Sequence, residues 1–204
     1  MSKETKQYYK FLNLRDGKMV SAHGSQVWEV GKEYSVKGKV RKCSNGFHAS
    51  EEPLQALRYI NGEVLALVEA SGDSDNDTDK VCYRSMKITK AYSWDKTTSV
   101  TMAIYAAEQV LKIYEDKYPN DNRPHDAIKA AKAYLKDSNK KNQDAAAYAA
   151  NAAANAAAYA AANAAANAAY AAANAAAYAA ANAEMTAKIN RFIKNRLKKL
   201  PEIR

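Results

Sequence analysis

Cysteine, proline and glycine are scarce in this 204-residue chain, which contains two, four and seven of them. The two cysteines, Cys43 and Cys82, do not indicate a disulfide framework and suit a reducing cytosol as free thiols. Strongly apolar runs are missing as well, since no stretch approaches the ~18 residues needed to cross a membrane. The opening MSKETKQYYKF is polar where a secretory signal would be apolar. We therefore expect a soluble, cytoplasmic protein.

Familiar catalytic and metal-binding motifs are also missing. The sequence has no Walker A motif, GxGxxG, GxSxG or HExxH. His23, His48, Cys43 and Cys82 lack the CxxC or HxxxH spacing of a zinc site. The acidic segment SGDSDNDTDK, residues 71–80, lacks the twelfth-position Glu of a calcium loop. We expect neither a metal nor a cofactor.

The chain is basic, with a formal net charge of +9 and an isoelectric point near 9.3. This charge attracts anions in general, but the basic residues are dispersed and are densest only in the tail, residues 188–204. A basic helical face of this kind is typically solvated. Nucleic acid is therefore not expected as a partner.

Strand and turn signals fill the first part of the chain. The segments YYKFLNL, GFHAS, EVLALVEA and VCYRSMKITKAYSW predict strands. The pair Asp16-Gly17 predicts a hairpin turn after the first of them. EEPLQALRYI predicts a short helix with Ser50 as its N-cap.

The spacing of the apolar residues changes near residue 96. The segment TTSVTMAIYAAEQVLKIYEDKY carries apolar residues at steps of three and four, which predicts an amphipathic helix. Its apolar positions are Val100, Ile104, Ala107, Leu111 and Tyr114. A second helix follows from DNRPHDAIKAAKAYLKD and a last one from MTAKINRFIKNRLKKL. We expect an α+β fold in which a small strand-rich domain, 1–95, packs on an all-α, Ala-rich domain, 96–204.

Residues 145–183 consist of alanine, asparagine and tyrosine alone. Alanine has the highest helix propensity, so this tract is predicted to be helical. Its Tyr and Asn residues recur at steps of three and four and follow one stripe of that helix. The sequence leaves open whether the helix is continuous and whether the stripe is solvated, buried or ligand-facing. The alanine face could pack against other helices or a second copy of the chain.

A ligand-facing stripe would offer tyrosine rings for stacking and asparagine amides for hydrogen bonds to a nucleotide-like molecule. At the start of the second helix, Arg123 and His125 flank Pro124, where the helix dipole favours an anion. The alternative for Arg123 is a surface ion pair with Asp121 or Asp126. The predicted ligand residues are Tyr148, Asn151, Asn155, Tyr159, Asn163, Asn167, Tyr170, Arg123 and His125.

The strand-rich half carries AHGS, then GFHAS, PLQALRY and EVLALVEASG. This order resembles the ADP-ribosyltransferase fold of the diphtheria-toxin and poly-ADP-ribose polymerase type. The resemblance implies a second candidate site, with His23 and Gly24 at the nicotinamide ribose and Tyr59 stacking on nicotinamide. It also implies a catalytic glutamate on the next strand, but VCYRSMKITKAYSW has none, and Glu69 lies on the preceding strand.

Two further resemblances bear on function. VWEVGKEY, the motif C-x-x-G-F-H-A from Cys43 to Ala49, and PLQALRY together resemble an uncharacterised domain of tailed-phage genomes. Residues 99 to about 185 resemble an immunity-protein domain of bacterial toxin–antitoxin neighbourhoods with the pattern P-x-D-x-R-P-x-x-A-I-x-A-A. The matching positions are Pro119, Asp121, Arg123, Pro124, Ala127, Ile128, Ala130 and Ala131.

These resemblances favour a phage-encoded, non-catalytic binding or inhibitory protein that acts in the cytoplasm of the host. Its partner would be a nucleotide-like ligand, which it sequesters, or a host defence protein, which it blocks. Two alternatives are an active ADP-ribosyltransferase that modifies a host target and a structural or ice-binding helical protein.

Overall fold

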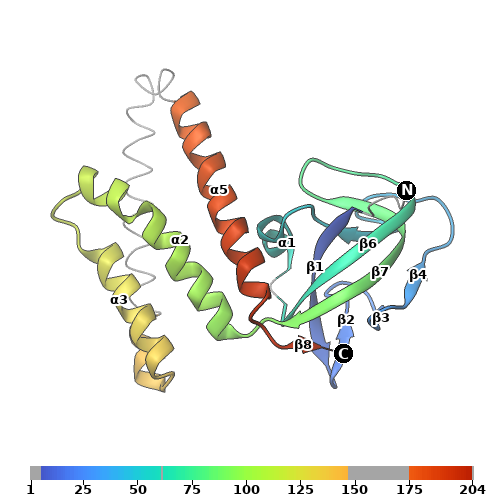
Figure 1. Cartoon of the computed structure of the whole chain (residues 1–204), viewed down its shortest axis with the longest axis horizontal. Helices are drawn as coiled ribbons and strands as arrows, with labels where there is room; N and C mark the ends of the chain where they lie inside the picture. Colours follow the sequence, from blue (N-terminus) through green and yellow to red (C-terminus); the bar gives the residue numbers. More distant parts are fainter. Residues whose placement is uncertain (1–5, 61, 147–174, 204) are drawn as a thin grey trace. The chain divides into compact units, whose positions relative to one another are not determined.

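The computed structural model describes residues 6–60, 62–146 and 175–203, so most of the alanine-rich tract lies outside it. Strands fill the N-terminal half and helices most of the C-terminal half (Figure 1), which confirms the α+β class. By contacts the chain divides into two units. The sheet unit comprises Met1–Asp95 with Asn190–Arg204, and the helical unit comprises Lys96–Ile189.

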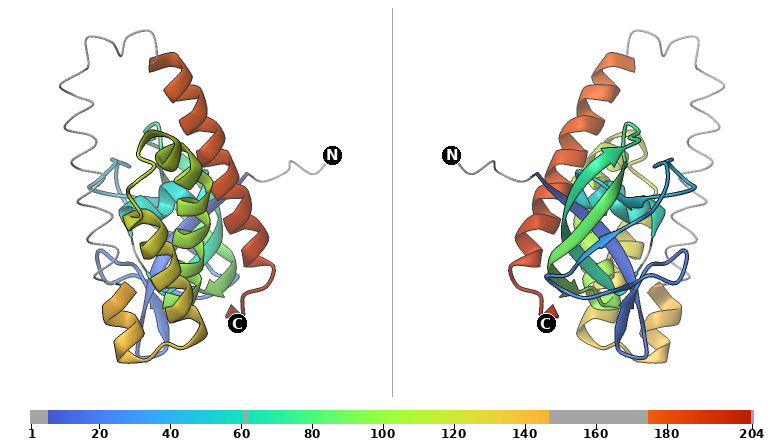
Figure 2. Two further views of the ribbon diagram at one scale, coloured as in Figure 1. Left: turned by 90° about the vertical axis from the view of Figure 1, so that its left-hand side faces the viewer. Right: turned by 90° about the vertical axis from the view of Figure 1, so that its right-hand side faces the viewer.

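One antiparallel sheet forms the frame of the sheet unit. Its strand order is β3-β2-β1-β6-β7-β4, and β5 and β8 also pair with β7. The long strands β1, β6 and β7 twist across one another (Figure 2). The strands are β1 Gln7–Arg15, β2 Lys18–Val20, β3 Val27–Trp28, β4 Glu33–Ser35, β5 Phe47–Ala49, β6 Val64–Ser74, β7 Val81–Ser93 and β8 Glu202–Ile203.

The turn predicted at Asp16-Gly17 is confirmed. Asp16 has a φ of 50° and Gly17 a φ of 74°. A two-residue hairpin with positive φ at both central positions matches the twist of the flanking strands, and Asp-Gly is a sequence that adopts it readily. The turn sets the register of β1 and β2, in which Arg15 lies opposite Lys18.

The sheet curls until it closes on itself. β5 pairs with β7 along one edge, and the next residue, Ser50, exchanges two backbone hydrogen bonds with Tyr9 on β1 at 2.8 and 2.9 Å. The prediction that Ser50 caps a helix is therefore wrong, because its backbone groups continue the sheet. Helix α1, Pro53–Tyr59, begins instead after Glu52, which forms a capping box with Gln55.

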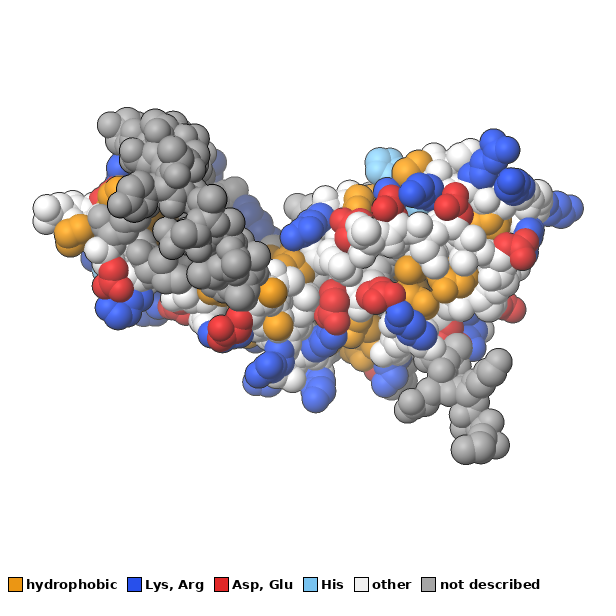
Figure 3. All heavy atoms as spheres, turned by 90° about the horizontal axis from the view of Figure 1, so that it is seen from above, with side chains coloured by type: hydrophobic (Ala, Val, Ile, Leu, Met, Phe, Trp, Pro, Cys, Tyr) orange, Lys and Arg blue, Asp and Glu red, His pale blue; other side chains and the backbone are white. Residues whose placement is uncertain are grey.

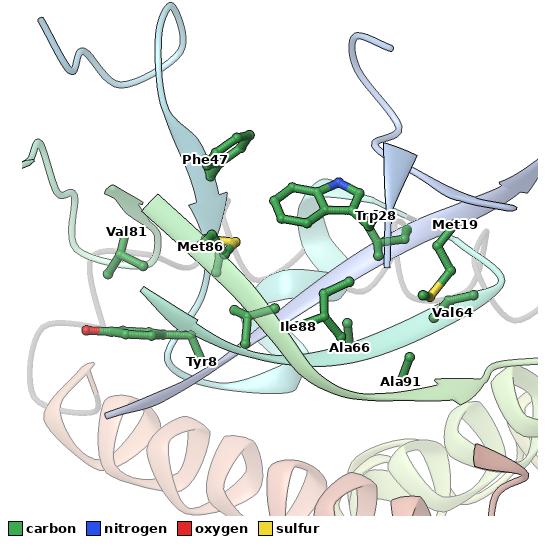
Figure 4. Packing of buried hydrophobic residues seen from close by; sticks show 13 residues of the cluster. Tyr8, Met19, Trp28, Phe47, Val64, Ala66, Val81, Met86, Ile88 and Ala91 are labelled. Atoms are coloured by element: carbon green, nitrogen blue, oxygen red, sulfur yellow. The ribbon is translucent and has the colours of Figure 1, made fainter. Parts of the chain in front are cut away.

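The inner face of the curled sheet holds the hydrophobic core (Figure 4). Trp28 lies near the centre, with its ring edge-to-face against Phe47 and Tyr34 at centroid distances of 4.9 and 5.2 Å. Aromatic pairs of this geometry add to the stability gained by burying their area. The core also contains Tyr8, Leu12, Met19, Ala49, Val64, Ala66, Val68, Val81, Met86, Ile88 and Ala91.

The end of the chain belongs to the sheet unit. Helix α5, Ala175–Leu197, buries Ile193 and Leu197, and β8 then pairs with β7, with Ile203 opposite Ala91. The expectation of an all-α C-terminal part is therefore corrected, because the last residues add a strand to the sheet.

Helices α2, Lys96–Lys117, and α3, Arg123–Lys136, pack together in the helical unit. Ile104, Ile128 and Tyr134 are buried, and the Lys132 ammonium lies 2.6 Å from the Glu108 carboxylate. The five apolar positions predicted for α2 are buried or half-buried. Within the described ranges, no helix combines the length and the hydropathy that a membrane crossing requires.

Candidate functional site

A cavity of about 640 Å³ opens in the sheet unit beside β1. Chain segments that are distant in sequence meet there because the sheet curls. Its walls are formed by β1 (residues 9–11), the β2–β3 loop (21–26), residues 43–44 and 46–50, the end of α1 (Ala56, Tyr59 and Ile60) and Lys80. The volume lies in the range of small-molecule sites in proteins.

The three residues of the second candidate site all line this cavity. His23 and Gly24 lie in the loop between β2 and β3. Tyr59 is the last residue of α1, and its hydroxyl donates a hydrogen bond to Asp79 at 2.6 Å. The Lys80 ammonium lies 4.9 Å from the centre of the Tyr59 ring. The geometry thus places together the residues that the ADP-ribosyltransferase resemblance singled out.

Lys10, which belongs to none of the motifs in the sequence, is also in the cavity wall. Its ammonium donates a hydrogen bond to the His48 carbonyl at 2.7 Å and lies 5.6 Å from the centre of the Trp28 ring. Burial lowers the pKa of Lys10 to about 8. The alternation in YYKFLNL contains the signal, because Lys10 shares its strand face with Tyr8 and Leu12, both of which are core residues.

A tight loop, residues 41–45, contributes residues 43 and 44 to the cavity wall. Arg41 and Asn45 pair through their backbones, and Cys43 at the tip has a φ of 61°, in the left-handed region. The backbone N–H of Cys43 donates to Nε2 of His48 at 3.1 Å. Burial first, and then the charges of Lys10 and Lys80, lower the pKa of His48. His48 is therefore neutral at pH 7 and holds the loop as a hydrogen-bond acceptor.

Gly46, in the motif C-x-x-G-F-H-A, lies where no other residue fits. Its φ is 143°, and a Cβ atom there would lie 2.4 Å from the sulfur of Cys82. Only glycine permits this approach of the backbone to β7. The motif is thus explained by close packing behind the cavity, with Cys82 buried and Cys43 exposed as free thiols.

The cavity wall is basic. Lys10, Lys80, His23 and His48 line it, and the lining contains no Asp or Glu side chain. Figure 3 shows histidine side chains beside Lys, Arg and hydrophobic side chains on the surface of the sheet unit. In the described part of the chain, no group of three His, Cys, Asp or Glu residues could hold a metal ion. The two ammonium groups of the wall, with no carboxylate beside them in the lining, favour an anion.

Arg123 does not offer the free positive charge that the sequence suggested. Its guanidinium makes two hydrogen bonds to the Asp121 carboxylate, at 2.8 and 2.6 Å. These hydrogen bonds, followed by one from Tyr114, hold the pKa of Asp121 far below its usual range. The alternative ion pair with Asp121 is thus the one that forms. His125 is exposed on α3, and a shallow hollow lies beside Arg123.

The predicted stripe on the alanine-rich tract lies outside the described residues. The residues concerned are Tyr148, Asn151, Asn155, Tyr159, Asn163, Asn167 and Tyr170.

The catalytic glutamate of an ADP-ribosyltransferase has no counterpart at the cavity. β7, the strand that follows β6, contains no glutamate. Glu69 is on β6, where its carboxylate pairs with the Lys87 ammonium at 2.8 Å, and it does not line the cavity.

Two family models match the chain. One is described as a domain of unknown function (DUF7666) and matches residues 9–100, which include every segment of the cavity wall. The other is described as an Imm-5 like putative immunity protein and matches residues 90–193, more than half of the chain. No curated protein and no solved structure matches the chain. The immunity-protein resemblance of the helical half is thereby confirmed, and the chain belongs to the family described as Imm-5 like putative immunity protein.

Proposed function

We propose that this protein is a non-catalytic inhibitor that acts by sequestering a nucleotide-like anion in the cavity of its sheet unit. The observation that supports the ligand is the cavity wall, in which Lys10, Lys80, His23 and His48 surround a space free of acidic side chains. Membership of an immunity-protein family fits an inhibitory role. The absence of a glutamate from β7 supports binding without transfer.

The shape and chemistry of a nucleotide suit this wall. A phosphate carries the negative charge that the two ammonium groups favour. A base or nicotinamide ring is flat, and Tyr59 presents a half-exposed ring at the rim. One stacked ring contributes ~1–3 kcal/mol, and a micromolar dissociation constant corresponds to about 8 kcal/mol. One stacked ring therefore supplies only part of this free energy, and the contacts of the anionic group with the two ammonium groups have to supply most of the remainder.

A second candidate function is the blocking of a host defence protein, as part of a conflict between phage and host. It is supported by the family match over residues 90–193, because an immunity protein neutralises its target by binding to it. In this case α2 and α3 would contact the partner. The phage origin rests on the motif resemblance of the N-terminal half.

Titration calorimetry of the full chain with NAD, ADP-ribose and cyclic di- and trinucleotides tests the ligand proposal. We expect one of them to bind with a micromolar dissociation constant. His23→Ala should weaken that binding at least tenfold, whereas His125→Ala, the same change on an exposed helix, should not. If none of the compounds binds below a millimolar, the nucleotide proposal fails and the protein partner becomes the better account.

A further inference from the structure

Lys10 has an unusual position for a lysine. On β1 it lies between Tyr8 and Leu12 on the face that forms the core of the sheet unit. A charged group among aromatic and aliphatic side chains loses its hydration, and the fold has to compensate for that loss. An uncharged side chain of similar length would serve this position better if packing were its only role.

The partners of the Lys10 ammonium compensate only partly for its lost hydration. They are one carbonyl, that of His48, and the face of Trp28. Within residues 6–60, 62–146 and 175–203, no carboxylate forms an ion pair with Lys10. The titratable groups that face it are the His48 imidazole on β5 and the buried Cys82 thiol on β7, and neither is negatively charged at neutral pH. The ammonium is thus a half-buried cation that has no anionic partner among the described residues.

The cavity reaches this cation, since Lys10 is part of its wall. We infer that Lys10 anchors the anionic group of the ligand, a phosphate or a carboxylate, deep in the cavity, and that Lys80 and Tyr59 contact the remainder at the rim. This inference rests on the proposed ligand function and specifies its chemistry. It explains why a half-buried lysine lies on the core-facing side of β1, because the ligand completes an ion pair that the protein leaves half-formed.

Anion binding should then be linked to proton uptake. Burial lowers the pKa of Lys10 to about 8 in the free protein, and a bound anion favours the charged form and raises that pKa. Between pH 8 and 9, binding should therefore draw a proton from the buffer and weaken as the pH rises. His23, His48 and Cys82 are all retained in the Lys10 variants below, so an effect that disappears in those variants belongs to Lys10.

The test follows the lysine ε-carbons by NMR in the full chain labelled with ¹³C-lysine. The Lys10 signal is assigned as the one missing from Lys10→Met; Lys18→Met, an exposed lysine on β2, is the matched control. We expect Lys10 to titrate with a pKa of about 8 and to shift upward by at least one pH unit with saturating ADP-ribose or inorganic pyrophosphate. Malonate in place of these probes distinguishes a carboxylate site from a phosphate site.

Binding and stability measurements complete the test. Lys10→Met should lose at least tenfold in affinity for ADP-ribose without a fall in melting temperature, whereas Lys10→Arg should keep part of the affinity. If Lys10→Met binds ADP-ribose as the wild type does, the anchor is wrong while the proposed function stands. If pyrophosphate raises the pKa of Lys10 but no nucleotide binds, Lys10 does anchor an anion, and the proposal that the ligand is a nucleotide is wrong. If no anion moves the Lys10 titration, the anchor is overturned.

Discussion

The side-chain oxygen of Asn190 accepts a hydrogen bond from the backbone N–H of Leu54 at 3.0 Å, across 136 positions of sequence. Leu54 is the second residue of α1, where a backbone N–H has no partner within the helix. Asn190 is buried on α5. A side chain near the C-terminus thus caps the helix that carries Tyr59 to the cavity rim.

Removal of this cap should destabilise the sheet unit. Asn190→Ala leaves the Leu54 N–H without its acceptor, so we expect the free energy of unfolding to fall by about 1–2 kcal/mol. Asn195→Ala, on an exposed position of the same helix, should change it by less than about 0.5 kcal/mol. Urea unfolding of both variants measures the difference. Equal effects of the two substitutions would contradict the claim that Asn190 stabilises α1 as its cap.

Gly46→Ala should be among the most destabilising single changes in the sheet unit. A methyl group there overlaps the Cys82 sulfur and also forces alanine to adopt a φ of 143°, which together should cost about 2–4 kcal/mol. Gly31→Ala is the matched control, because Gly31 also has a positive φ but has open space around it. Its cost should be about 1–2 kcal/mol. A similar melting temperature for the two variants would show that the sulfur moves aside.

The stability of the sheet unit should depend on pH through Lys10. The pKa of Lys10 is lowered by burial to about 8 in the folded protein, from 10.5 for a free lysine. The unfolded state therefore binds more protons between these values, and stability rises with pH through this window. Below pH 8 Lys10 is charged in the folded protein, and the whole cost of removing its ammonium from water is present. Lys10→Met should therefore be more stable than the wild type at these pH values. The difference in stability should shrink toward pH 10.5. A difference that does not change with pH would contradict this account.

The protein should transfer no ADP-ribose, since β7 lacks a glutamate and the cavity wall contains no carboxylate. Incubation with labelled NAD and a bacterial lysate should leave every protein unlabelled. Labelling that disappears in a His23→Ala, Tyr59→Phe double variant would show that the cavity is an active site after all.

Local sequence signals predicted the elements that local forces determine. Asp16-Gly17 forms its hairpin turn because positive φ values suit these residues, and the three-and-four spacing of Ile104 and its neighbours identifies α2. In contrast, the bond between Ser50 and Tyr9, the pairing of β8 with β7 and the cap at Asn190 join distant segments. No window of sequence contains both partners of such contacts.

The candidate site was predicted in part for the same reason. The motifs around His23 and Tyr59 were found through a family resemblance, and the curled sheet brings them to one cavity. Lys10 was not found, because a lysine in a strand normally marks its solvated face. Its role depends on which face of β1 turns inward, and that is decided by Trp28 and Phe47 from other strands.

The most direct test of the cavity as the ligand site is a map of backbone amide shifts in the ¹H–¹⁵N spectrum during titration with the best ligand of the nucleotide panel. We expect the shifted amides to lie in the cavity wall, at residues 9–11, 21–26 and 43–50. The amide signals of α2 and α3 should not shift. Shifts concentrated on α2 and α3, or their absence from the cavity wall at saturation, would contradict the claim that the sheet unit holds the ligand.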